Sequence, residues 1–185
     1  MEHAPRRTLV VEDLYRLPDD GRRYELVNGR LVSEPLSGGR RGRIAATIAS
    51  LIARHVREHR LGVVVTCDTG FVLARGPDTV RGPDVAFINR KRWERLHDDT
   101  RAIPGAPDLA IEVLGPESSP VDVHAKVADF LAAGTPRVWV VDPEQECVDV
   151  FRTLLEPRCF IGDDELAGEI ALPGFRARVA TLFQL

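Results

Sequence analysis

The spacing of apolar residues along the chain first predicts helices. Between 44 and 59 the apolar residues recur at helical spacing, with arginines toward the opposite side of the helix. Ser119 followed by proline is typical of a helix start and Gly134 of a helix end, so a second helix is expected over 120–133. A short capped helix over 8–15 is expected to precede both.

The strands are predicted by β-branched and aromatic residues that stand between turn signals. Alternating polar and apolar residues on both sides of Asn28-Gly29 are typical of a hairpin. The stretch 90–106 is expected to be a surface loop with one helical turn. The tail that ends in Leu182-Phe183 is expected to be β-strand. The other predicted strands are 63–66, 71–74, 85–88, 109–114, 137–142 and 147–151. The sum is a mixed α/β (α+β) domain over residues 1–185, without internal repeats or a linker.

Length and composition narrow the class of protein. A chain of 185 residues with 44% apolar and 29% charged residues can bury one hydrophobic core, which excludes disordered and fibrous classes. Its 25 basic and 28 acidic residues give a net charge of -3, so any contact with nucleic acid must be local. No apolar run approaches the ~18 residues of a membrane span, and acids stand where a signal peptide would be apolar. We therefore expect a soluble, cytoplasmic protein with no membrane partner.

The cysteines and histidines form no clear metal or nucleophile motif. Cys67, Cys147 and Cys159 are odd in number and lack zinc-site spacing, so we expect them to be reduced and structural. His55 and His59 have the spacing of a metal pair, but they lie on an arginine-rich helix face that favours solvated surface. The chain also has no HExxH, GxSxG or glycine-rich phosphate loop. Carboxylates and lysine remain as the groups for a site.

Glu112 is the most informative of the carboxylates. It interrupts the otherwise apolar strand LAIEVL, which is expected to be buried on both faces. An unpaired carboxylate in such a place loses its hydration and either becomes protonated or destabilises the fold. Its neighbours are therefore expected to include a cation, a metal ion or several hydrogen-bond donors. A buried structural ion pair is the alternative.

Asp84 and Lys126 are two further candidates. Asp84 follows Gly82-Pro83 and directly precedes a buried strand, although acids at strand starts are often only turn formers. Lys126 lies inside the second predicted helix, where a solvated pair with Asp122 is the alternative. The 25 basic residues include only two lysines, Lys91 and Lys126, so the generic surface cation of this chain is arginine. A compact, titratable ammonium suits a reactive site better than a guanidinium does.

Two carboxylates on neighbouring strand ends, together with a lysine, form a site for a hard divalent cation that binds substrate phosphate. Phosphodiester hydrolysis uses such a site: the carboxylates hold Mg²⁺, the metal acidifies a water, and the lysine positions or deprotonates that water. Two local basic patches, 39–43 and 90–95, are suited to tracking a phosphate backbone, with solvated surface as the alternative for each.

A family resemblance is carried by four separate blocks of sequence. The blocks are RRYELVNGRLV, VRGPDVAFI, APDLAIEVLGPES and KVADFLAAGTPRVWVVDP, in this order over residues 8–183. With them the chain resembles the bacterial Uma-two family of restriction endonucleases, within the PD-(D/E)xK nuclease superfamily. The resemblance implies a restriction-endonuclease-like mixed sheet flanked by helices, after an N-terminal helix and β-hairpin.

The resemblance also implies a set of site residues. Asp84 and Glu112 match the motif acids that hold the metal. The superfamily lysine, expected where this chain has Leu114, has moved in this family to the following helix, at Lys126. Glu25 matches a recurrent acid of the family and is a fourth candidate for the site.

The sequence thus predicts a Mg²⁺-dependent nuclease, with Mn²⁺ as a substitute ion, that hydrolyses phosphodiester bonds in DNA. Such domains usually cut two strands with two copies, which predicts a homodimer. The rival hypothesis is a catalytically inactive nuclease-fold module for binding or assembly, but all the candidate catalytic residues are present. One departure is that family members often carry a histidine near the start of the first long helix. Here Arg40, Arg41 and Arg43 stand there, which leaves substrate contact in that region open.

Overall fold

The computed structural model describes residues 7–34, 38–66 and 69–184. The helices are α1 (Val11–Leu14), α2 (Gly39–Glu58), α3 (Arg90–Trp93), α4 (Pro120–Ala132) and α5 (Val179–Phe183). The strands are β1 (Arg23–Val27), β2 (Arg30–Glu34), β3 (Gly62–Thr66), β4 (Phe71–Ala74), β5 (Thr79–Arg81), β6 (Val85–Asn89), β7 (Ile103–Pro104), β8 (Leu109–Val113), β9 (Val138–Asp142), β10 (Cys147–Phe151), β11 (Arg158–Ile161), β12 (Glu165–Ala167) and β13 (Arg176–Arg178).

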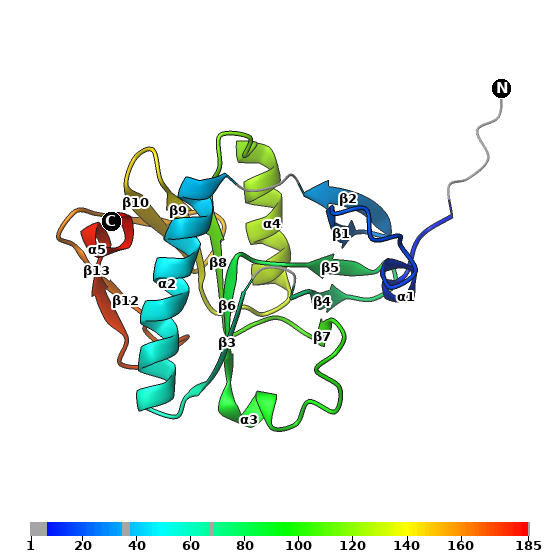
Figure 1. Cartoon of the computed structure of the whole chain (residues 1–185), viewed down its shortest axis with the longest axis horizontal. Helices are drawn as coiled ribbons and strands as arrows, with labels where there is room; N and C mark the ends of the chain where they lie inside the picture. Colours follow the sequence, from blue (N-terminus) through cyan, green and yellow to red (C-terminus); the bar gives the residue numbers. More distant parts are fainter. Residues whose placement is uncertain (1–6, 35–37, 67–68, 185) are drawn as a thin grey trace.

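Two mixed sheets form the frame of the molecule. The larger has six strands in the order β11-β10-β9-β8-β6-β3, in which only β8 and β9 are parallel. Helix α4 connects these two strands, as a parallel pair requires a crossover. The smaller sheet has the order β2-β1-β5-β4-β7, and β12 pairs with β13 separately. In Figure 1 the smaller sheet and α1 lie on one side of the larger sheet, and β12, β13 and α5 lie on the other.

Helices α2 and α4 cover opposite faces of the six-stranded sheet (Figure 1). The apolar stripe of α2, which includes Ile48, packs in one buried cluster with Ile111 of β8. Phe130 of α4 packs in a second cluster with Ala110 of the same strand. Successive residues of a strand point to opposite faces, so a central strand covered on both sides is apolar throughout, as the sequence of β8 predicted.

This alternation also brings the two candidate acids to one face. Ala110 faces α4, so Glu112, two residues further along β8, faces α4 as well. Strand β6 pairs antiparallel with β8, with Val85 opposite Ile111. Continued by one residue, this register sets Asp84 opposite Glu112, on the same side of the sheet.

The β1–β2 hairpin agrees with the sequence prediction, whereas the start of α2 does not. Asn28 and Gly29 connect β1 to β2 with φ angles of 49° and 71°, the left-handed values that a two-residue hairpin turn requires. The predicted hairpin is therefore confirmed. Helix α2 begins at Gly39, earlier than the expected residue 44. Its apolar spacing gave no sign of the first turn because the buried position there is occupied by Arg41.

The C-terminal tail differs from its prediction. Residues expected to end in a strand form α5, in which the buried Val179 and Leu182 stand three residues apart, as on one side of a helix. The stretch 90–106 contains α3 and the two-residue strand β7, close to the expected loop with one helical turn. Cys147 and Cys159 are free thiols as expected, while Cys67 lies outside the described residues. None of the helices in the described part of the chain has the length and apolar character needed to cross a bilayer.

Candidate active site

A cluster of buried charges lies where β6 leaves the preceding loop. Seven charged residues are buried in the described ranges, and all of them except Asp78 belong to this cluster. Ion pairs join most of its members. Because buried charges are costly unless they are paired, their concentration at one place marks a candidate functional site. The six members are Glu25, Arg41, Arg81, Asp84, Glu112 and Lys126.

Asp84 is held from two sides at the start of β6. Its Oδ2 accepts a hydrogen bond of 2.8 Å from the backbone amide of Val113, in the neighbouring strand β8. Arg41, in the first turn of α2, donates to both carboxylate oxygens. Arg23 Nη1 lies 4.0 Å from Oδ1. Asp84 is therefore more than a turn former: it ties β6, β8 and α2 together.

Glu112 has the least satisfied carboxylate of the cluster. Its side chain is buried, and its Oε1 lies 3.2 Å from the Lys126 ammonium without a well-directed hydrogen bond. Burial raises the pKa of Glu112 to about 8; the Lys126 ammonium lowers it in part, and the charges of Asp84 and Glu25 raise it further. The sequence argument expected this acid to need a partner, and Lys126 is that partner.

Lys126 reaches the acids from α4. It stands three residues after Val123 and four before Phe130, which places it on the buried stripe of its helix. Its Nζ lies 3.2 Å from Glu112 Oε1 and 3.0 Å from Glu25 Oε1, and it donates to the backbone oxygen of Gly82 at 3.1 Å. The ammonium is therefore buried between two acids, and the solvated surface alternative is wrong.

Glu25 of β1 joins the cluster through a second cation, Arg81 of β5. Arg81 Nη1 donates to Glu25 Oε2 at 2.8 Å, and the amide of Gly82 donates to Oε1 at 2.7 Å. Burial raises the pKa of Glu25, but the charges of Lys126 and Arg81 outweigh burial and hold it below its ordinary value. Arg81 also pairs with Asp129 of α4 at 2.7 Å. Glu25, suggested by resemblance alone, thus lies in direct contact with Lys126.

Arg41 and Arg81 are the members that sequence reasoning missed. Arg41 precedes Ile44 by three residues and therefore continues the buried stripe of α2, but a charged residue at this position gives no hydrophobic signal in the sequence. Arg81 stands in a run of buried residues at the end of β5, a strand that was not predicted. The six buried side chains comprise three acids and three bases, so the cluster is close to neutral when all are ionised.

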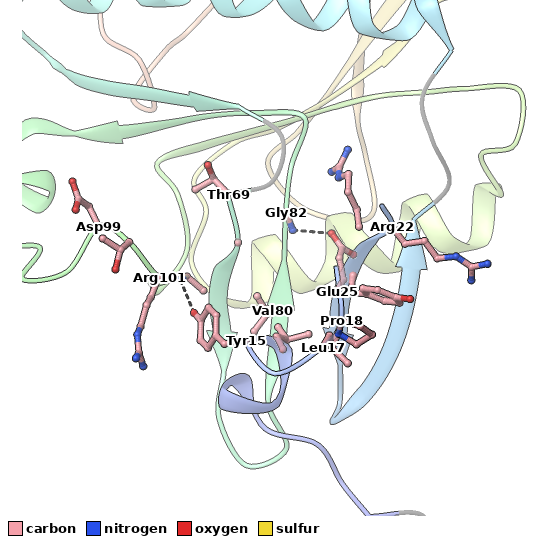
Figure 2. Close-up of a pocket in the computed structure, with 16 residues that line it drawn as sticks. Tyr15, Leu17, Pro18, Arg22, Glu25, Thr69, Val80, Gly82, Asp99 and Arg101 are labelled. Carbon is pink, nitrogen blue, oxygen red and sulfur yellow. Dashed lines mark hydrogen bonds between the residues drawn. The ribbon is translucent and has the colours of Figure 1, made fainter. Parts of the chain in front are cut away.

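Two hollows border the cluster. The first, of about 480 Å³, is lined by Tyr15, Thr69 and Arg101 and has Glu25 at one end (Figure 2). The second, of about 300 Å³, is lined by Arg41, Glu112, Lys126 and Glu117 among others. Because Lys126 pairs with both Glu25 and Glu112, the charged cluster lies between the two hollows. A substrate in the second hollow would touch Glu112 and Lys126 directly.

The two basic patches are largely occupied by contacts within the protein. Arg40 pairs with Glu144 at 2.7 Å. Arg92 donates to backbone oxygens in the 104–106 turn, and Trp93 packs against the core. The predicted phosphate contacts of these side chains thus gain no support. His55 Nε2 donates to the backbone oxygen of Pro173 (2.9 Å), which likewise speaks against a histidine metal pair.

The acidic side chains of the cluster are the candidates for holding a metal ion. No group of three or more His, Cys, Asp or Glu side chains suited to an ion occurs within 7–34, 38–66 and 69–184. Mg²⁺, however, is usually bound by only one or two carboxylates, with waters and substrate phosphates as its other ligands. Glu112 Oε1 is a buried acceptor without a well-directed hydrogen bond, and Asp84 stands opposite Glu112 in the strand register. These two carboxylates would suit a single Mg²⁺ or Mn²⁺.

Comparison with solved structures identifies the class of fold. A crystal structure described as "a putative nuclease belonging to DUF820 from Anabaena variabilis" matches with a TM-score of 0.80. The match covers 95% of this chain and 97% of the other, at 22% sequence identity. The chain therefore has a nuclease-like fold of mixed sheets flanked by helices, as expected. A comparison with curated proteins gave no match.

The family follows from the sequence itself. A sequence model of the Uma2 family, described as "Putative restriction endonuclease", matches residues 11–180, and the chain belongs to this family. The resemblance inferred from the four sequence blocks is thus confirmed.

Proposed function

We propose that this protein is a nuclease that uses Mg²⁺, or Mn²⁺ in its place, to hydrolyse phosphodiester bonds in DNA. Asp84 and Glu112 would hold the ion, and Lys126 would assist the attacking water. Membership of a restriction endonuclease family supports the reaction class. The structural observation that carries the proposal is Glu112, a buried carboxylate whose Oε1 lies 3.2 Å from the Lys126 ammonium without a well-directed hydrogen bond.

The proposed roles of the cluster residues follow from their positions. When bound, the metal would polarise the phosphate and lower the pKa of a water. Lys126, 3.2 Å from Glu112 Oε1, would orient that water and offset the negative charge that develops on the phosphate. Glu25 contacts the Lys126 ammonium at 3.0 Å, so its role would be to position the lysine. Arg81 in turn fixes Glu25.

The rival proposal is an inactive nuclease-fold module for binding or assembly. Its supporting observation is that Arg41 already pairs with Asp84, so that a protein cation neutralises one metal ligand. Against it stand the retention of Asp84, Glu112 and Lys126 in one buried cluster and the poorly satisfied carboxylate of Glu112. A module without catalysis would gain nothing from keeping a carboxylate in this condition.

Cleavage of DNA decides between the two proposals. Supercoiled plasmid, linear duplex and single-stranded DNA and RNA are incubated with the purified protein in Mg²⁺, Mn²⁺ or EDTA. We expect metal-dependent nicking or linearisation that Asp84→Asn and Glu112→Gln abolish. Glu144→Gln, whose side chain is 76% exposed, should match the parent. Cleavage of RNA but not of DNA would show that the substrate is RNA. Binding of DNA without cleavage under every metal condition would establish the inactive module.

We further propose a homodimer in the cytoplasm, because one site in a chain of this length cuts one strand at a time. Sedimentation equilibrium measures the mass in solution directly. A monomer at concentrations that linearise plasmid would contradict this part of the proposal and leave the site intact.

A further inference from the structure

The most unusual feature of the cluster is that the side chain of Arg41, a cation of the protein itself, binds Asp84, a proposed metal ligand. Arg41 is only 8% exposed, and its guanidinium meets Asp84 in a two-pronged arrangement. Nη2 lies 3.1 Å from each carboxylate oxygen, and Nε lies 3.3 Å from Oδ2. Since Oδ2 also accepts the Val113 amide, both oxygens of Asp84 are engaged by donors.

This arrangement competes with direct metal binding at Asp84. A guanidinium on both oxygens takes lone pairs that an ion would use, and two cations on one carboxylate repel each other. Glu112, the other proposed ligand, is less saturated, because its Oε1 lies 3.2 Å from Lys126 without a well-directed hydrogen bond. An ion that binds both acids would therefore compete with Arg41 for Asp84.

A second acceptor and an open hollow lie beside Arg41. Its Nη1 points toward Glu117 Oε1 at 3.4 Å, and both residues line the hollow of about 300 Å³ that contains Glu112 and Lys126. Guanidinium binds a phosphate in the same bidentate geometry as a carboxylate. A nucleic-acid phosphate in this hollow would therefore compete with Asp84 for Arg41.

We propose that Arg41 is an internal counter-ion that occupies Asp84 until a phosphate of the nucleic acid draws it away. This inference rests on the proposed metal site and adds its regulation. Metal ion and nucleic acid then bind with positive coupling, because the phosphate removes the cation that blocks the metal. By reciprocity the metal tightens nucleic-acid binding by the same factor. The protein holds little metal until a substrate is present.

Metal binding in the absence of catalysis tests the proposal. Free Mn²⁺ is measured by electron paramagnetic resonance during titration, with and without a hydrolysis-resistant phosphorothioate duplex. The proteins compared are the parent, Arg41→Gln and the matched control Arg40→Gln. Arg40 is the neighbouring arginine of α2, and its partner Glu144 is exposed, so its change removes the same charge away from Asp84.

Without DNA, Arg41→Gln should bind Mn²⁺ at least tenfold more tightly than the parent, a difference of about 1.4 kcal/mol. DNA should tighten Mn²⁺ binding of the parent and of Arg40→Gln by a similar factor, and that of Arg41→Gln by less than about twofold. Equal or weaker Mn²⁺ binding by Arg41→Gln, with coupling to DNA unchanged, would overturn the proposal. Arg41→Lys, which keeps a cation, should lie between the parent and the glutamine variant.

Failure of the metal site itself gives a different result. In that case neither the parent nor Arg41→Gln binds Mn²⁺, with or without DNA, and Asp84→Asn behaves as they do. Thermal unfolding provides the folding control and a second readout. Since Mn²⁺ stabilises the fold in proportion to its binding, it should raise the melting temperature of Arg41→Gln more than that of the parent.

Discussion

The carboxylate of Asp84 accepts the backbone amide of Val113 at 2.8 Å, so the start of β6 is hydrogen-bonded to the strand that carries Glu112. This bond fixes the first acid relative to the second without any contribution from a bound ion. The fold itself therefore holds the two acids in place, which is the preorganisation that the proposed site requires. The charges around them lead to four predictions.

Glu112→Gln should gain stability over the parent as the pH rises. The folded pKa of about 8 is above the ordinary 4.5, so between these values the folded protein keeps a proton that the unfolded chain releases. The stability of the parent therefore falls across this window, and glutamine removes the effect. We expect a difference on the order of a few kcal/mol between pH 5 and pH 8.5 in metal-free urea unfolding. A stability difference that does not change with pH would mean that Glu112 stays ionised over this range and forms a stable ion pair with Lys126.

Glu25→Gln should show the opposite pH dependence. The pKa of Glu25 is held below its ordinary value, so its contribution to stability is present above the unfolded pKa and is lost as the pH falls through the folded one. At pH 7 the variant should be less stable by about 3–5 kcal/mol, because Lys126 and Arg81 lose a buried partner. The gap should narrow as the pH falls below the ordinary pKa of 4.5. Chemical unfolding against pH measures this, and Glu144→Gln is the control. An equal gap at all pH values would contradict the expected linkage.

Lys126 should be replaceable for folding but not for cleavage. Lys126→Arg keeps a cation near Glu25 and Glu112 but loses the compact ammonium, so its melting temperature should fall little while single-turnover cleavage slows by about 100-fold or more. Lys126→Met leaves two buried acids without their shared cation and should lower the melting temperature strongly at neutral pH. Full activity of the arginine variant would remove Lys126 from the mechanism.

Mg²⁺ should stabilise the folded parent and not the variants that lack a ligand. An ion present at 100 times its dissociation constant adds about 2.7 kcal/mol when it binds only the folded state. We therefore expect Mg²⁺, at concentrations high enough to compete with Arg41, to raise the melting temperature of the parent but not of Asp84→Asn or Glu112→Gln. Differential scanning fluorimetry with a Ca²⁺ and an EDTA series measures the shift. Equal stabilisation of all three proteins would mean that the ion binds elsewhere.

Much of the fold and part of the candidate site could be read from the sequence, because they depend on local periodicity. A strand of period two that is apolar on both faces predicts burial, which made Glu112 stand out in β8. The hairpin turn at Asn28 and Gly29 and the two long helices follow from equally local rules. Lys126 was found because lysine is rare in this chain and because of the family resemblance.

The pairing of the charges needed the folded chain. Arg41 reaches Asp84 across 43 residues of sequence, and Arg81 reaches Glu25 across 56. No periodicity links residues at such separations; the packing of α2 on one face and α4 on the other decides which cations meet which acids. Burial then changes their chemistry, since the same carboxyl group has its pKa raised at Glu112 and lowered at Glu25 according to the donors within reach. The amino-acid sequence identifies these residues as ionisable, and only their three-dimensional surroundings determine the protonation state that each of them favours.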